Sequence, residues 1–173
     1  MNESPQRLGK GMIYVSWLLV LGLLFLFFNH FLDNQYNPNQ EIETQYDQDG
    51  TKEVILQRSR SGHYVATGMI NRQSVIFFLD TGATMVSIPE KVALRLNLKR
   101  GKPMLANTAN GTVTTYHTQL ESIALGGIEL HNIRASINPS MLSEEILLGM
   151  SFLKHLEFAQ RGDILTLRQY ANK

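Results

Sequence analysis

The apolar positions of this chain fall into one long block near the N-terminus and many short blocks after it. Residues 11–28 read GMIYVSWLLVLGLLFLFF, with no charge and only Ser16 distinctly polar. A helix needs about 20 apolar residues to cross the hydrocarbon core of a bilayer, and the uncharged continuation to Leu32 reaches that length. The pattern predicts one transmembrane helix over 11–32, after a short N-terminal tail over 1–10.

Two other interpretations of the long block are a cleaved signal peptide and a helix buried in a soluble core. A signal peptide has a shorter apolar stretch that ends at small residues, whereas this block ends in the bulky run FFNHF. A core helix needs folded chain on both sides, and only ten residues precede this one. The pattern favours an uncleaved anchor.

The charges that flank the block predict its orientation. Arg7 and Lys10 precede it, whereas the nearest charged residue after it is acidic, Asp33. Basic flanks stay in the cytoplasm, so the N-terminal tail is expected there and the rest of the chain outside. The expected location is therefore the inner (plasma) membrane, crossed once, with the folded part extracytoplasmic. In a Gram-negative bacterium that compartment is the periplasm.

The segment after the predicted helix has a different composition. Residues 33–50 are rich in Asn, Gln and acidic side chains and poor in aliphatic ones. Such a segment buries too little apolar area to offset the conformational entropy that it loses on ordering. The composition predicts a flexible linker over 33–52, followed by one folded domain over 53–170.

Beyond the linker the apolar blocks are short, rich in Val, Ile, Phe and Thr, and separated by Gly or Asn turns, which is typical of an all-β domain. Two hairpins are expected, one turning at Asn71-Arg72-Gln73 and the other at Gly126-Gly127. The expected strands are, in chain order, 63–70, 75–79, 123–125, 128–130 and 164–168.

Two short helices are expected to interrupt the strands. The first begins at a capping box formed by Ser87 and Glu90, with Pro89 in its first turn, and ends near Asn97. The second begins after Gly149. The expected apolar faces are Val92, Ala93 and Leu96 in the first helix and Phe152, Leu153 and Leu156 in the second. The predicted fold class is all-β with one or two short helices.

Composition narrows the possible chemistry. The chain has 16 basic and 15 acidic residues and a net charge of +1, so no nucleic-acid partner is expected. It has no cysteine, which excludes disulfides, thiolate catalysis and Cys-ligated zinc. Its five histidines form no HExxH motif and no i, i+4 pair. Neither a metal nor a cofactor is therefore expected.

One sequence stands out as a candidate for catalysis. A hydrophobic strand ends on Asp80, and Thr81 and Gly82 follow at once. A buried lone carboxylate is costly unless it is paired or its pKa is shifted. Asp-Thr-Gly is also an ordinary turn, so the tripeptide alone is weak. Its context adds weight, because a polar tip over 107–112 and an apolar strand that ends in Leu148-Gly149 follow downstream.

This order of motifs resembles the retropepsin-like aspartic proteases, in particular the bacterial membrane-anchored members with one Asp-Thr-Gly-Ala turn per chain. The resemblance covers about residues 53–169 and implies a closed β-barrel or sandwich. The site residues that it implies are Asp80 as the catalytic group, Thr81, Gly82 and Ala83 in the active-site turn, Leu148 and Gly149 as supports, and Thr108, Ala109, Asn110 and Gly111 in a flap. Such a flap closes over a peptide that binds as an added strand.

The sequence departs from the viral members of that family at two places. The tip of the expected flap is Thr-Ala-Asn-Gly rather than glycine-rich. Met150 stands where viral enzymes carry an arginine that helps to fix the dimer. The contacts of a dimer therefore cannot be transferred from the viral enzymes.

Aspartic proteolysis uses two carboxylates that share one proton, because like charges at close range cannot both ionise. This chain has a single Asp-Thr-Gly. Asp80 is therefore expected to meet the partner's Asp80 across a two-fold axis, in a membrane-anchored homodimeric endopeptidase that acts on peptides or proteins. An aspartyl-phosphate enzyme would need further carboxylates to hold Mg²⁺ and alternating helices, which are missing. The remaining alternative is a catalytically silent retropepsin-fold module for peptide binding or dimerisation.

Overall fold

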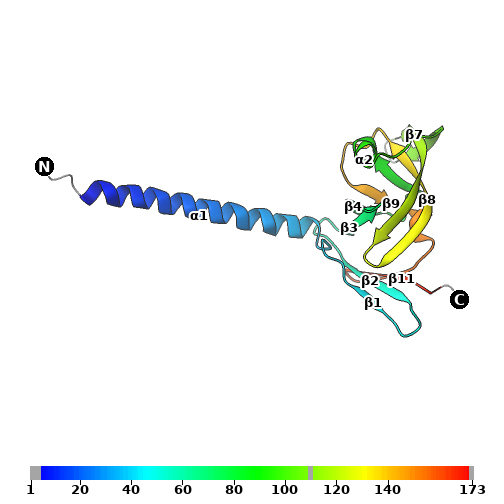
Figure 1. The fold of residues 1–173 in the computed structure, drawn as a ribbon, viewed down its shortest axis with the longest axis horizontal. Helices are drawn as coiled ribbons and strands as arrows, with labels where there is room; N and C mark the ends of the chain where they lie inside the picture. The colour runs from blue at the N-terminus through cyan, green and yellow to red at the C-terminus, as the bar shows by residue number, and fades with distance from the viewer. Residues whose placement is uncertain (1–4, 109–110, 172–173) are drawn as a thin grey trace. The chain divides into compact units, whose positions relative to one another are not determined.

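The computed structural model describes residues 5–108 and 111–171, and it divides into a helical unit up to Gln35 and a β-rich unit from Tyr36 onward. In chain order the elements are α1 (Pro5–Tyr36), β1 (Thr44–Tyr46), β2 (Lys52–Gln57), β3 (Val65–Ile70), β4 (Gln73–Leu79), β5 (Val86–Pro89), α2 (Glu90–Arg95), β6 (Pro103–Thr108), β7 (Gly111–Leu125), β8 (Ile128–Asn138), β9 (Ile146–Leu148), α3 (Met150–Leu153), β10 (Glu157–Arg161) and β11 (Ile164–Gln169) (Figure 1). The fold is mostly β with two short helices after α1, as predicted.

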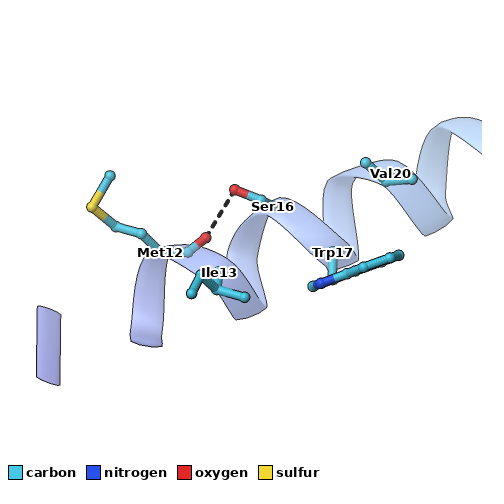
Figure 2. Close-up of a pocket in the computed structure, with 5 residues that line it drawn as sticks. All are labelled: Met12, Ile13, Ser16, Trp17 and Val20. Carbon is cyan, nitrogen blue, oxygen red and sulfur yellow. Dashed lines mark hydrogen bonds between the residues drawn. The ribbon is translucent and has the colours of Figure 1, made fainter. Parts of the chain in front are cut away.

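Helix α1 begins before the predicted span and ends after it. Within the described residues it is the one helix that is long and apolar enough to cross a membrane, over Gly11–Tyr36. Its apolar side chains are exposed, Trp17 by 63%. The hydroxyl of Ser16 donates to the carbonyl oxygen of Met12 at 2.9 Å (Figure 2). This hydrogen bond satisfies the polar group of Ser16 within the helix itself.

The strands form two sheets. The larger has the order β3-β4-β9-β5-β8-β7-β6, and an additional pairing of β3 with β7 closes it into a barrel. The smaller has the order β1-β2-β11-β10, and Figure 1 shows β2 and β11 side by side. Side chains of both sheets share one buried cluster, to which the smaller sheet contributes Val54, Leu56, Leu165 and Leu167. The predicted closed barrel is confirmed.

Closure of the barrel depends on a glycine. Residues Met69 and Ile70 of β3 pair with Ala124 and Ile123 of β7. A Cβ atom on Gly68 would lie 2.4 Å from the carbonyl oxygen of Ala124 and 2.5 Å from the ring of Phe77. Only a residue without a side chain permits β3 to approach this closely.

Both predicted hairpins are present. Strands β3 and β4 are joined by Asn71 and Arg72, with φ of 48° and 65°. Two consecutive residues with positive φ make the two-residue turn whose twist matches antiparallel strands. Strands β7 and β8 are joined by Gly126 and Gly127, and Gly126 has a φ of 58°.

The predicted capping box is wrong. Ser87 lies in β5, paired with Ser136 of β8, and its hydroxyl donates to the sulfur of Met141. Helix α2 starts three residues later, at Glu90, without a side-chain cap. The reason is burial, since Val86 and Ile88 on either side of Ser87 are completely buried. Alternation into the core favours a strand, and it outweighs the local capping pattern.

The structure also differs from the linker that composition predicts over 33–52. Helix α1 continues to Tyr36, and residues 44–46 form β1. Asn39 is only 4% exposed. Its amide nitrogen donates to the carbonyl oxygens of Gln57 (2.8 Å) and Val65 (2.7 Å), and its Oδ1 accepts from the N–H of Gln57 (2.7 Å). The prediction from composition missed this ordered segment because an Asn side chain can hydrogen-bond to the backbone of a neighbouring strand, which orders the segment without burying apolar area.

Candidate active site

Asp80 lies where strand β4 ends. The N–H of Leu79 donates to the carbonyl oxygen of Tyr64 at 3.0 Å, and the N–H of Asp80 donates to the carbonyl oxygen of Leu148 at 3.3 Å. Strands β4 and β9 run parallel, with Leu79 beside Leu148. The structure thus brings together the two motifs that sequence analysis singled out, although 65 residues of chain, 83–147, separate them.

The Asp-Thr-Gly segment forms a tight turn around the carboxylate. Oδ1 of Asp80 accepts the N–H of Gly82 at 2.8 Å, and the N–H of Ala83 donates to the carbonyl oxygen of Asp80 at 3.2 Å. The first is the side-chain bond expected of an Asp turn. A Cβ on Gly82 would lie 3.2 Å from Oδ1, closer than a Cβ atom usually approaches. Glycine at this position leaves the carboxylate undisturbed.

The carboxylate is accessible. Asp80 is partly exposed, and Thr81 and Gly82 are exposed. Within the described residues Oδ2 of Asp80 has no hydrogen-bond partner. The carboxylate therefore keeps one oxygen available to a ligand, a water molecule or a second protein chain.

Gly149 lies against the far end of the turn. A Cβ on this residue would lie 2.4 Å from the carbonyl oxygen of Met85 and 2.5 Å from that of Ala83. The N–H of Met150 donates to the same Ala83 oxygen at 2.8 Å. Leu148 is completely buried. Both predicted support residues therefore lie against the active-site turn, and their supporting role stays a prediction.

Sequence reasoning missed Ser151. Its hydroxyl accepts the N–H of Val86 at 2.9 Å and so joins α3 to the first residue of β5. The available signal was its place in the first turn of a helix, where Ser side chains commonly bond backbone N–H groups. Which N–H group the hydroxyl bonds depends on the fold, because Val86 is 65 residues away.

The predicted flap falls on the hairpin of β6 and β7. Thr108 and Gly111 are paired at its end, and the Thr108 hydroxyl donates to the Gly111 carbonyl oxygen at 2.8 Å. The hydroxyl of Thr112 donates to Oδ1 of Asn107 at 2.9 Å. Ala109 and Asn110 lie outside the described residues. The hairpin is present, and its role as a flap stays a prediction.

A hollow of about 480 Å³ adjoins the turn and includes Asp80 and Thr81 in its wall. Most of the rest of its wall is apolar, from Phe78, Leu79, Leu153, Phe158, Leu165 and Leu167. Tyr64 also lines it, is 8% exposed, and has a hydroxyl without a partner in the described part of the chain. A buried hydroxyl without a partner is costly, so the Tyr64 hydroxyl is a polar group in this wall that could bond to a ligand or to water.

The next question is whether side chains gather that could bind a metal ion. Across the ranges that the structure describes, no group of three or more His, Cys, Asp or Glu side chains could hold a metal ion.

The chain matches a known family over most of this region. The model described as "gag-polyprotein putative aspartyl protease" matches residues 66–155, just over half of the chain. An uncharacterized protein in the cobV 5′ region of Sinorhizobium sp is 30% identical over 96% of this chain and 77% of that protein. The uncharacterized protein RP867 of Rickettsia prowazekii (strain Madrid E) is 30% identical over 66% of this chain, which spans about half of that relative.

A solved structure agrees with the fold. The crystal structure of a retropepsin-like aspartic protease from Rickettsia conorii superposes with a TM-score of 0.58 at 28% identity, and covers 76% of this chain and 97% of that one. The matched family region contains both the Asp80 turn and Gly149. The chain therefore belongs to the gag-polyprotein aspartyl protease family and has the retropepsin-like fold.

Proposed function

We propose that this protein is a membrane-anchored aspartic endopeptidase that hydrolyses peptide bonds with a water molecule activated between Asp80 and the partner's Asp80. The observation that carries the proposal is the state of the Asp80 carboxylate. Asp80 directly follows strand β4 of the barrel, and its Oδ1 accepts the N–H of Gly82. Its Oδ2 has no hydrogen-bond partner in the described residues.

The reaction needs two carboxylates that share a single proton. The ionised carboxylate takes a proton from water, and the water oxygen attacks the carbonyl carbon of the peptide. The protonated carboxylate gives its proton to the carbonyl oxygen. When the tetrahedral intermediate collapses, the C–N bond breaks and the leaving nitrogen receives a proton from the pair. Because the pair titrates as a unit, either copy can supply the acid.

The single Asp-Thr-Gly turn supports a homodimer. A symmetric pair supplies both carboxylates from one kind of chain. Thr81 is exposed beside Asp80, where its hydroxyl would brace the turn of a second copy. The proposed partner of this surface is therefore another copy of the same chain.

The apolar helix α1 supports a membrane anchor. We place it across the inner membrane with the N-terminus in the cytoplasm and the protease domain on the extracytoplasmic side, as the flanking charges predict. Two copies anchored in one membrane have a raised effective concentration. The anchor would thereby favour pairing of two protease domains.

The proposed substrate is an extended segment of a peptide or protein. The hairpin of β6 and β7 would cover it as a flap, with Thr108, Ala109, Asn110 and Gly111 at the tip. An extended peptide held in this way pairs through its backbone, and its side chains are selected by pockets.

The test is cleavage of a peptide library by the full chain in detergent micelles across a range of pH. We expect Asp80→Asn to lower turnover on the order of 10³-fold or more, because the reaction loses its shared proton. Asp163→Asn makes the same chemical change at an exposed loop position and should retain activity. Equal turnover by Asp80→Asn and the parent would contradict the mechanism. Binding of peptides without cleavage by the parent would indicate the silent module instead.

A further inference from the structure

Residues 36–39, which we call the strap, directly follow the helical unit and are bonded to the barrel. Asn37 and Asn39 are only 5% and 4% exposed. The amide nitrogen of Asn37 donates to the hydroxyl of Thr67 at 2.9 Å, and its Oδ1 accepts the N–H of Asn39 at 3.0 Å. Buried polar side chains are costly unless they are hydrogen-bonded, and these two are. The strap is therefore an ordered part of the barrel.

The backbone of the strap also pairs with β3. Asn39 forms a parallel bridge with Ala66, and its carbonyl oxygen accepts the N–H of Thr67 at 3.0 Å. Ala66 pairs with Phe77 of β4, and Asp80 follows Phe77 three positions later. Two strand spacings of about 4.8 Å and three residues of about 3.3 Å place the Cα atoms of Asn39 and Asp80 roughly 14 Å apart.

Tyr36 links the strap to the apolar helix. It is the last residue of the candidate membrane span Gly11–Tyr36, and its hydroxyl donates to the carboxylate of Glu145. Asn39 follows it three positions later, a stretch of chain that covers at most about 11 Å. Tyr36 thus lies no more than about 25 Å from Asp80. This limit follows from bond lengths and strand pairing alone.

So short a connection limits where the Asp80 carboxylate can act. The uncharged run ends at Leu32, and four helical residues from there to Tyr36 add about 6 Å. With α1 across the membrane, Asp80 lies at most about 30 Å from the hydrocarbon core. A free linker over 33–52 could instead extend to about 70 Å. The strap therefore more than halves the reach of the active site, which is the largest distance of Asp80 from the hydrocarbon core.

We propose that the strap confines the active site to the membrane surface, and that its substrates are extracytoplasmic segments of other membrane proteins close to the bilayer. This inference rests on the proposed function, because it keeps the reaction and narrows the substrate class. An extended chain covers 30 Å in about nine residues, so the cleaved bond lies within about that distance of the substrate's own membrane span. Two proteins in one membrane also have a raised effective concentration. Segments held much farther from the bilayer are spared.

Membrane-anchored model substrates with rigid spacers test the reach. Each has a transmembrane helix, a Pro-rich spacer of about 5 or about 30 residues, and one sequence that the peptide library shows to be cleaved. A Pro-rich chain rises about 3.1 Å per residue, so the two cleavage sites stand about 16 Å and about 93 Å from the bilayer. The full chain and one substrate are reconstituted together in phosphatidylcholine vesicles, and the rate of cleavage is measured.

We expect the parent to cleave the short-spacer substrate at least about tenfold faster than the long-spacer substrate. The control is the same two extracytoplasmic segments as soluble peptides without an anchor, which should be cleaved at equal rates. Equal rates for the two anchored substrates would overturn the inference. It would also be overturned if the anchored short-spacer substrate stayed intact while its soluble segment was cleaved.

A longer tether should remove the preference. A flexible Gly/Ser insertion of about 40 residues between Gln35 and Tyr36 leaves the sequence of the strap intact. It adds a root-mean-square reach of about 35 Å and about 130 Å at full extension. We expect the ratio of the two rates to fall below about threefold. The same insertion before Met1, on the expected cytoplasmic side, adds no reach and should keep the parent ratio. An unchanged ratio after the insertion at Gln35 would contradict the role of the strap.

Failure of this inference can be distinguished from failure of the proposed function. Every rate is measured for Asp80→Asn beside the parent, on both the soluble and the anchored substrates. Cleavage of soluble peptides that requires Asp80, without a preference between the anchored substrates, would sink the reach limit alone. Cleavage that persists in Asp80→Asn would sink the catalytic mechanism, whatever the length of the spacer.

Discussion

The N–H of Met150 donates a hydrogen bond to the carbonyl oxygen of Ala83 at 2.8 Å. Helix α3 therefore begins directly against the last residue of the active-site turn. The residue before Met150 is the glycine whose missing side chain makes this approach possible. The position of the Asp80 turn and the start of α3 are thus one structural feature, although the two segments are distant in the chain.

Gly149→Ala should destabilise the β-rich unit. The added Cβ would lie 2.4 Å from the carbonyl oxygen of Met85 and 2.5 Å from that of Ala83, and backbone atoms cannot move aside as a flexible side chain can. We expect a loss of about 2–4 kcal/mol in the free energy of unfolding, in the range of severe core overpacking. Thermal unfolding followed by the circular dichroism of the β-sheets measures it.

Gly22→Ala is the matched control for this substitution, because nothing lies within 4 Å of the added atom. It should leave the unfolding of the β-rich unit unchanged. Similar melting of the two variants would show that Gly149 does not hold the turn.

Mixing parent and Asp80→Asn chains tests whether one active site needs the Asp80 carboxylates of two chains. When parent and Asp80→Asn chains are mixed in equal amounts and exchange freely, random pairing leaves about one quarter of the dimers with two intact Asp80 residues. Activity should therefore fall to about a quarter of that of the same total amount of parent. A fall to only one half would mean that each chain works alone. Peptide cleavage at constant total protein distinguishes the two results.

Asn39→Ala should destabilise the β-rich unit at its N-terminal end. The substitution removes three hydrogen bonds to Gln57 and Val65 and leaves backbone groups unpaired in a buried place. We expect a loss of about 2–3 kcal/mol, the cost of buried polar groups without partners. Gln48→Ala removes an exposed amide from the same polar segment and should cost less than about 0.5 kcal/mol. Hydrogen exchange of the Gln57 amide reports the local effect.

The pair of Tyr36 and Glu145 should make a small, pH-dependent contribution to stability. The hydroxyl of Tyr36 donates to the carboxylate, and this hydrogen bond lowers the pKa of Glu145 below its ordinary value. A carboxyl group whose pKa is lowered in the folded state stabilises the protein above the ordinary pKa. That stability is lost as the pH falls through the lowered pKa.

Tyr36→Phe should remove this part of the acid sensitivity, and at neutral pH it should cost no more than about 1 kcal/mol because the pair is partly exposed. Unfolding measured between pH 3 and 7, a range set by ordinary carboxyl titration, tests it. A parent and a variant whose stabilities run parallel over the whole range would contradict the assignment.

Local features of this protein could be predicted from sequence because their causes lie within a few residues. The apolar length of α1, the paired positive-φ residues at Asn71 and Arg72, and the turn after Asp80 are of this kind. Each depends on side-chain size or backbone freedom at adjacent positions. The motif at Leu148 and Gly149 was found for the same reason, as a strand that ends in glycine.

Other features depend on partners that are distant in the chain, and tertiary structure decided them. Ser87 has the local sequence of a helix cap and lies in a strand because Val86 and Ile88 are buried on either side. Asn39 has the local sequence of a linker and is buried because Gln57 and Val65 offer it backbone partners. Local preferences of this kind are small, so burial and long-range pairing outweigh them when the two disagree.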